Sequence, residues 1–295
     1  MEKKFNRESY PFDILEKFGL TEGMLLDLPG YVHDIIERGG KSPLLPLTVS
    51  QPDGKTVRCY AKFALVDFDG EPEVMFYPKF KQADLAPFDE LQREALLEGK
   101  VIVADVMDRF VTDEGVEDEQ RIKAFVQLDQ DTNTVVYTPT PTIARNISAL
   151  SDVYGLDGDE IRRFWDGDLV MTRVRNDEGV EETVTIGVDL NTETGVLAVP
   201  GIAEQWIMAV RRRMPEYSFG MEGCWINRDG RLRYVHEEDF TSDIIEAQQE
   251  SSRQQELLLH AKGRMHSGDE YEEPMGNHVN PADEYGYDAS RGIGY

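Results

Sequence analysis

The feature that most constrains the fold of this chain is a turn-and-strand pattern that occurs three times. Each copy runs a polar turn into a short apolar strand that ends at a proline. The three prolines, Pro78, Pro139 and Pro200, are separated by 61 residues twice. A fixed period is the signature of repeat architectures, in which each copy is one supersecondary unit. The sequence therefore predicts a tandem array.

Each predicted unit is a helix closed by a glycine and followed by three strands. The closing glycines are Gly39, Gly99 and Gly167, and glycine readily adopts the left-handed conformation that ends many helices. The strands are rich in β-branched residues and are separated by polar turns. Residues 41–78, 100–139 and 168–200 are therefore predicted to form antiparallel three-stranded meanders, each with its preceding helix on one face.

The helices of these units have short apolar stripes that are expected to face the strands. The predicted stripe residues are Val32, Ile35, Ile36, Leu91, Ala95, Leu96, Ile161, Phe164 and Trp165. His33, Asp34 and Glu37 are assigned to an exposed face. Trp165 is predicted to be a core residue, because a short helix must cover a sheet with few large side chains. The acidic segment 113–119 is predicted to be a mobile loop.

The pattern changes after Pro200. A helix over 202–214 and a hairpin over 222–236 are expected to cap the open end of the array, and a further helix follows at 242–262. Residues 265–295 carry seven acidic residues and one basic residue, and they are expected to be disordered. The predicted fold class is α+β: three αβββ units, a helix-and-hairpin cap and an acidic tail. The predicted boundaries are 10–80, 81–140, 141–200, 201–240, 241–264 and 265–295.

Charge and cysteine content limit the classes of partner and compartment. The chain has 57 acidic and 31 basic residues, for a net charge of -26, which repels nucleic-acid phosphates and anionic membranes and favours basic partners. The excess is interpreted either as a means of solubility or as mimicry of a nucleic-acid backbone. Cys59 and Cys224 are far apart and form no CxxC, so a reducing, cytoplasmic setting is expected.

Motifs for catalysis or cofactor binding are absent from the sequence. The five histidines have no metal-ligand spacing, and no GxxxxGK[ST], GxGxxG or GxSxG motif occurs. No run of about 18 apolar residues is present that could span a bilayer. Cys224 lies beside Trp225 in a predicted strand, where a buried structural thiol is favoured over a nucleophile. The sequence therefore predicts no enzyme activity, no cofactor, no metal and no membrane partner.

Two stretches are candidates for binding a partner. Trp206 with the run Arg211–Arg213 is the one concentrated basic and aromatic feature. It is expected either to contact a phosphate backbone or an acidic partner, or to pair with neighbouring acids. The tail tyrosines would provide contact area in an adaptable recognition segment, unless the tail has no function. The candidate residues are Trp206, Arg211, Arg212, Arg213, Tyr271, Tyr285, Tyr287 and Tyr295.

A resemblance to a known group rests on two stretches. Phe12-Asp-Ile-Leu-Glu-Lys-Phe-Gly-Leu20 with Leu44-Leu-Pro-Leu47 is similar to an N-terminal domain, and the segment from Phe88 to Val103 is similar to the start of a repeated domain. Both belong to uncharacterised proteins, known as domains of unknown function, of conjugative and other mobile elements of gut anaerobes. The resemblance covers roughly residues 10–140, and the third unit departs from it, with Asp168 where the second has Lys100.

The resemblance implies a role around mobile DNA, sometimes beside relaxase or topoisomerase modules, and brings no catalytic residues. Together with the acidic charge, it leads to the expectation of a non-enzymatic adaptor that binds another protein with a basic surface. The alternative is an acidic inhibitor that mimics nucleic acid and blocks a DNA- or RNA-binding host enzyme. A third possibility is an enzyme whose site is not recognisable from sequence.

Overall fold

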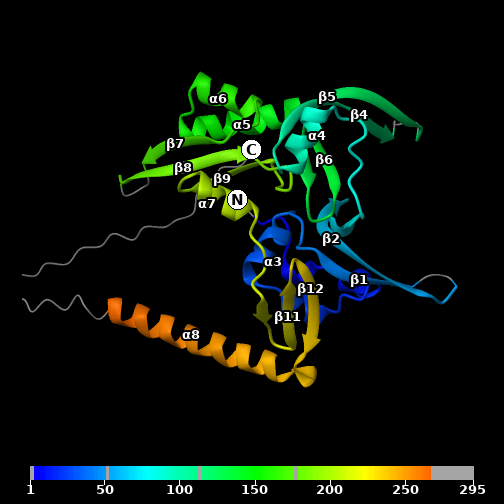
Figure 1. Ribbon diagram of the computed structural model, residues 1–295, viewed down its shortest axis with the longest axis vertical. Helices are drawn as coiled ribbons and strands as arrows, with labels where there is room; N and C mark the ends of the chain where they lie inside the picture. Colours follow the sequence, from blue (N-terminus) through cyan, green and yellow to red (C-terminus); the bar gives the residue numbers. More distant parts are fainter. Residues whose placement is uncertain (1–2, 51–52, 112–114, 176–178, 267–295) are drawn as a thin grey trace, which may run out of the picture. The chain divides into compact units, whose positions relative to one another are not determined.

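The computed structural model describes residues 3–50, 53–111, 115–175 and 179–266 (Figure 1). The predicted acidic tail lies almost wholly outside these residues. The chain divides into two compact parts, Met1–Ile245 and Glu246–Tyr295, and each is described by itself. The described residues form eight α-helices and four three-stranded sheets, which confirms a fold that mixes helices with antiparallel sheets.

The strands follow one another in sequence order within every sheet, and all pairs are antiparallel. The first sheet consists of β1 (Leu45–Ser50), β2 (Thr56–Phe68) and β3 (Glu71–Pro78). The second consists of β4 (Ile102–Val111), β5 (Glu117–Asp129) and β6 (Thr134–Pro139). The third consists of β7 (Val170–Arg175), β8 (Glu181–Val188) and β9 (Val196–Pro200). The fourth consists of β10 (Tyr217–Phe219), β11 (Gly223–Arg228) and β12 (Arg231–His236), and the sequence did not predict β10.

The helices lie between the sheets in sequence. A short 3-10 helix η1 (Arg7–Ser9) and helices α1 (Phe12–Glu16), α2 (Glu22–Leu26) and α3 (Gly30–Glu37) precede the first sheet. Helix α4 (Glu90–Leu97) precedes the second sheet, and α5 (Thr140–Tyr154) and α6 (Gly158–Trp165) precede the third. Helix α7 (Ala203–Val210) follows the third sheet, and η2 (Glu237–Asp239) and α8 (Ser242–His266) follow the fourth.

Each of the three prolines is the last residue of the third strand of its sheet. Each lies in the third strand, directly opposite a residue of the central strand: Ala61, Ala124 and Val184 are the partners of Pro78, Pro139 and Pro200. Proline cannot donate a backbone hydrogen bond, so it is tolerated at the end of an edge strand and stops it there. One residue type therefore sets the length of three edge strands.

The helix ends before these sheets are also alike. Gly39, Gly99 and Gly167 have φ angles of 83°, 81° and 81°, a region that side chains with a Cβ rarely adopt. In each case the next residue donates its N–H to the carbonyl five residues earlier, as in a Schellman cap. The residue three positions before each glycine is fully buried, and these residues are Ile36, Leu96 and Phe164.

Two stripe residues and two supposedly exposed residues are placed differently from the prediction. Leu91 is 78% exposed and Ile35 is 44% exposed, whereas His33 and Glu37 are buried. Residues three and four positions apart share a helix face, so Val32 with Ile36, and His33 with Glu37, form the buried side of α3. Glu37 is buried because the N-terminal segment covers it and supplies its cationic partners Lys3 and Arg7.

Helix α5 was not predicted, and it joins the second and third sheets. Its buried residues are Ile143 and Ile147, one turn apart among polar neighbours. Ile143 packs in one cluster with Phe125 of β5 and Val184 of β8, and Asn146 donates a side-chain hydrogen bond of 2.6 Å to the carbonyl of Thr194. So narrow a stripe is weak evidence for a helix, since longer apolar stripes are the usual signal.

The strands are longer than predicted. The segment 113–119 was expected to be a mobile loop, but Glu117–Glu119 belong to β5 and pair with Arg109–Val111 of β4. Opposite charges support this pairing, because Arg109 lies 3.5 Å from Glu119 across the strands. The acidic composition of this hairpin therefore does not prevent strand formation.

The helix predicted over 202–214 is shorter than predicted, because it ends at Val210.

The predicted cap does not act as one element, because its two parts pack on different sheets. Helix α7 lies against the third sheet, whereas β11 and β12 lie beside α3 and the first sheet (Figure 1). Trp225 of β11 is fully buried in the core cluster of the first sheet, and its Nε1 donates to the carbonyl of Met24 at 2.8 Å. The chain therefore returns from the third sheet to complete the first core.

Trp165 is 38% exposed, so the prediction that it is a core residue is wrong. Adjacent residues of a helix with 3.6 residues per turn point in different directions. The neighbouring Phe164 is fully buried, in the core cluster between the second and third sheets. The Trp165 ring instead lies against Phe125 of the second sheet, with 5.6 Å between ring centroids. The Trp165 side chain is therefore only partly buried.

Phe164→Ala is expected to lower the free energy of unfolding by about 3 to 5 kcal/mol, because it leaves a cavity in a closed core. Trp165→Ala should cost clearly less, since more than a third of that side chain already contacts solvent. Urea unfolding of both variants measures the difference. Equal costs would contradict the placement of the two rings.

Candidate functional site

The predicted partner-binding residues fall into two sets. Tyr271, Tyr285, Tyr287 and Tyr295 lie outside the described residues. Trp206 and the run Arg211–Arg213 lie in and just after α7. Only the second set can therefore be placed in a site.

Trp206 is buried, and its indole is not offered to a partner. It is 8% exposed, and its Nε1 donates to the carbonyl of Leu197 at 2.9 Å. The ring covers Gly187 of β8, where an added Cβ would lie 2.7 Å from an indole carbon. The glycine therefore makes room for the tryptophan, and Trp206 attaches α7 to the third sheet.

The opposite side of α7 is apolar and exposed. Because Trp206 points toward the third sheet, the following residues point away from it, and Ile207 and Met208 are 41% and 72% exposed. Exposed apolar residues that cluster on one helix are more informative than single ones. Sequence reasoning missed this side because both sides of α7 are apolar.

Three arginines follow this exposed side, and all three are exposed. The Arg212 guanidinium lies over the Tyr31 ring, 3.8 Å from its centroid. The expected pairing with neighbouring acids is not found: in the described part of the chain, none of the three forms an ion pair. We call this region the α7 surface and define it by Ile207, Met208, Arg211, Arg212 and Arg213.

A second cluster of charged groups is buried where the first three sheets meet. Lys62 of β2 is 8% exposed, and its Nζ donates to both carboxylate oxygens of Asp129 at 2.9 and 3.0 Å. Burial alone would raise the pKa of Asp129, but the Lys62 ammonium outweighs it and holds that pKa below the ordinary value. Asp131 lies 2.9 Å from the same ammonium at the exposed rim.

Lys41 and Asp189 extend this cluster to the third sheet. The Lys41 Nζ donates to Asn191 Oδ1 at 3.3 Å and lies over the Tyr77 ring, and burial lowers its pKa. Burial raises the pKa of the Asp189 carboxyl, which accepts a hydrogen bond from the N–H of Asn191 at 3.1 Å. We call this cluster the polar junction, defined by Lys41, Lys62, Asp129, Asp189 and Asn191.

Perturbed pKa values are common in active sites, but structural ion-pair networks perturb them too. In the polar junction Lys62 pairs with Asp129, and Asn191 is a hydrogen-bond partner of both Lys41 and Asp189. Leu190, between β8 and β9, donates its N–H to the side chain of Gln127 in the second sheet at 2.7 Å. The arrangement joins three sheets through side chains distant in sequence. We therefore interpret the polar junction as structural.

Thiol and metal chemistry have little support in the described residues. Cys224 is fully buried, as predicted, and burial raises its pKa to about 11, which keeps the thiol protonated and unreactive. Among the side chains that the structure describes, no group of His, Cys, Asp or Glu is arranged to hold a metal ion.

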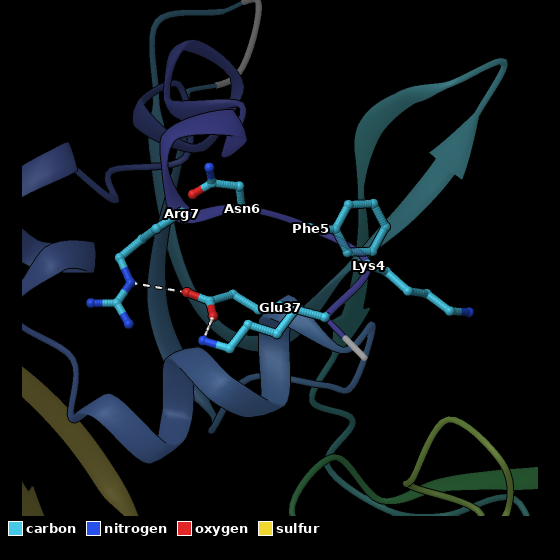
Figure 2. A pocket seen from close by; sticks show the side chains of 6 residues that line it. Lys4, Phe5, Asn6, Arg7 and Glu37 are labelled. Atoms are coloured by element: carbon cyan, nitrogen blue, oxygen red, sulfur yellow. Dashed lines mark hydrogen bonds and ion pairs between the residues drawn. The ribbon is translucent and has the colours of Figure 1, made fainter. Parts of the chain in front are cut away.

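A shallow pocket lies beside the N-terminal segment, and Figure 2 shows Glu37 between the side chains that line it. The Arg7 Nε donates to Glu37 Oε1 at 3.0 Å, and Lys3 pairs with the other carboxylate oxygen. The Lys4 ammonium is 2.6 Å from Glu193 of the third sheet's hairpin. The three cationic side chains of the pocket therefore already have acidic partners, and these ion pairs fasten the N-terminal segment to the fold.

No protein-family model matches the chain, and no curated protein sequence does so significantly. Among the described helices, none is both long enough and apolar enough to cross a membrane. The α7 surface is therefore assessed on its geometry and charge alone.

Proposed function

We propose that the protein is a non-enzymatic adaptor that binds another protein through the α7 surface. The observation that supports this is a basic patch without acidic partners in a strongly acidic chain. With 57 acidic residues available, three neighbouring arginines would be expected to find carboxylates within the fold, yet they form no ion pair with described residues. Arginine beside exposed apolar side chains is a common composition at binding hot spots.

The segment that fits the α7 surface is acidic and partly apolar. Guanidinium groups bind carboxylates in bidentate geometry, and Ile207 and Met208 supply the apolar contact that limits solvent screening. Methionine adapts to different partner shapes because its side chain is flexible and polarizable. The net charge of -26 further favours a partner whose remaining surface is basic.

We also propose that the first three sheets, with their preceding helices, are three copies of one αβββ unit spanning residues 10–80, 81–140 and 141–200. The shared strand order, glycine caps and proline positions support this. The resemblance over residues 10–140 favours an accessory role on a mobile genetic element in the cytoplasm.

The test compares a variant of the α7 surface with a matched control. The test variant carries Ile207→Ser, Met208→Ser, Arg211→Ser and Arg213→Ser. The control carries Val153→Ser and Arg145→Ser on α5, an exposed apolar residue and an exposed arginine on another helix. Arg212 is left in place because it stacks on Tyr31.

Affinity capture from cells that carry the native gene should yield a partner with the wild type and the control. The α7 variant should retain at least about tenfold less of it, which corresponds to 1.4 kcal/mol. Equal capture by all three proteins would rule out the α7 surface. A nucleic-acid-binding enzyme that is captured equally and released at moderate salt would support the inhibitor instead, because that contact would use acidic residues.

A further inference from the structure

The outer edge of β4 is the most available strand edge in the described residues. With ten residues, β4 is the longest strand at the side of any of the four sheets, and it pairs with β5 alone. Its sequence, Ile-Val-Ala-Asp-Val-Met-Asp-Arg-Phe-Val, contains no proline, glycine or lysine. Proline and lysine are residues with which proteins commonly block an edge against pairing. The charged residues of β4, Asp105, Asp108 and Arg109, block pairing only with a strand that places like charges opposite them. By contrast, β1, β3, β6 and β9 all contain proline.

The half of β4 farther from the core is also rich in exposed apolar residues. Met107, Phe110 and Val111 are 50%, 37% and 66% exposed, and this half of the β4–β5 hairpin extends past α4 (Figure 1). A long edge strand with apolar side chains and free backbone groups is a template for adding another strand. Such an edge needs either a cover or a partner.

We propose that the β4 edge pairs with the β4 edge of a second copy of this chain, in an antiparallel arrangement centred on Met107. The pairing would join two second sheets into one continuous six-stranded sheet. It adds self-association to the proposed adaptor function and does not depend on the α7 surface.

The charges of β4 select this register. In an antiparallel pair of identical strands about a twofold axis, opposite residues lie on the same face, so the axis must pass through one residue. Centring on Asp105, Asp108 or Arg109 would place like charges opposite each other, which is destabilising. Centring on Val106 places every charged residue opposite an uncharged one, so that register forms no ion pair between the copies.

Centring on Met107 places Asp105 of each copy opposite Arg109 of the other. The same register places Met107 opposite Met107 and Val103 opposite Val111, so apolar residues flank the two ion pairs. Within one chain, Asp105 already lies 3.1 Å from Arg121, and Arg109 lies 3.5 Å from Glu119. The dimer would therefore line up alternating charges across four strands.

The test uses charge reversal in two single variants. Asp105→Arg places arginine opposite Arg109 in a pair of identical copies, and Arg109→Asp places aspartate opposite Asp105. Each variant alone should dimerise at least about tenfold more weakly than the wild type, a loss of 1.4 kcal/mol. An equal mixture of the two should form a heterodimer, because both cross-strand pairs then have opposite charges. Sedimentation equilibrium measures all four samples.

The mixture separates the proposal from a general loss of stability, since each variant has the same internal contacts whether alone or mixed. Met107→Cys in a Cys59→Ser background should also form a disulfide between copies under mild oxidation. Met171→Cys on β7 should not, although the Met171 side chain is as exposed as that of Met107. A monomeric wild type would overturn the proposal. The proposal would also be overturned by charge-reversal variants that dimerise as tightly as the wild type, or by variants that stay monomeric when mixed.

Discussion

Replacing Lys62 by Met is expected to lower the free energy of unfolding by about 3 to 5 kcal/mol, because it leaves a buried carboxylate without its cation. Asp129 is 3% exposed and accepts both of its close ionic hydrogen bonds from Lys62. Methionine keeps the length of the side chain, so the cost measures lost charge pairing more than lost packing. Urea unfolding at pH 7 gives the value.

The double variant Lys62→Met, Asp129→Leu should recover most of this loss, since it removes both charges. Lys55→Met is the matched control: Lys55 pairs with Asp53 at 2.9 Å, but both side chains are at least half exposed, and such pairs contribute about 0 to 1 kcal/mol. Equal costs for Lys62→Met and Lys55→Met would show that the polar junction does not hold the sheets together.

The effect of Lys62→Met should also depend on pH. Because the Lys62 ammonium holds the folded-state pKa of Asp129 below the ordinary value of an aspartate, the stabilisation from its ionised form is fully present above that ordinary value. It is lost as the pH falls through the lower folded-state pKa. The stability difference between wild type and Lys62→Met should therefore shrink in strong acid.

Replacing Trp225 by Ala should be at least as damaging, with an expected loss of about 3 to 5 kcal/mol from the cavity alone. The side chain is fully buried among residues of the first core, and it also provides a hydrogen bond to the carbonyl of Met24. An unsatisfied buried carbonyl adds about 1 to 3 kcal/mol. Urea unfolding monitored by circular dichroism measures the difference in the free energy of unfolding between this variant and the wild type.

Trp225→Phe separates the two contributions, because it keeps most of the apolar volume and removes only the indole N–H. It should cost about 1 to 3 kcal/mol. A Trp225→Ala variant that unfolds at the same urea concentration as the wild type would mean that the fourth sheet does not stabilise the first core.

Much of the strand pattern could be predicted because single residues decide it locally. Gly39, Gly99 and Gly167 end helices through their positive φ angles, and proline ends the third strand of each of the first three sheets. Helix α5 could not be predicted from its narrow stripe of Ile143 and Ile147. Local signals therefore located elements well where backbone conformation, rather than side-chain packing, set their limits.

The candidate site was only partly predictable for a different reason. The run of three arginines is visible in the sequence, but which side of α7 is buried depends on Gly187, nineteen positions before Trp206. The polar junction depends on longer separations still, since Lys62 and Asp129 are 67 residues apart. Nothing local distinguishes Lys62 from the exposed lysines of the chain.

The return of the fourth sheet to the first has a consequence for synthesis on the ribosome. The first core closes only when Trp225 and Leu232 reach it, so some two hundred residues must emerge while that cluster still lacks one wall. Contacts of this sequence separation slow folding and leave apolar surface open to aggregation. The N-terminal helices would therefore be the part of the nascent chain that most needs a chaperone.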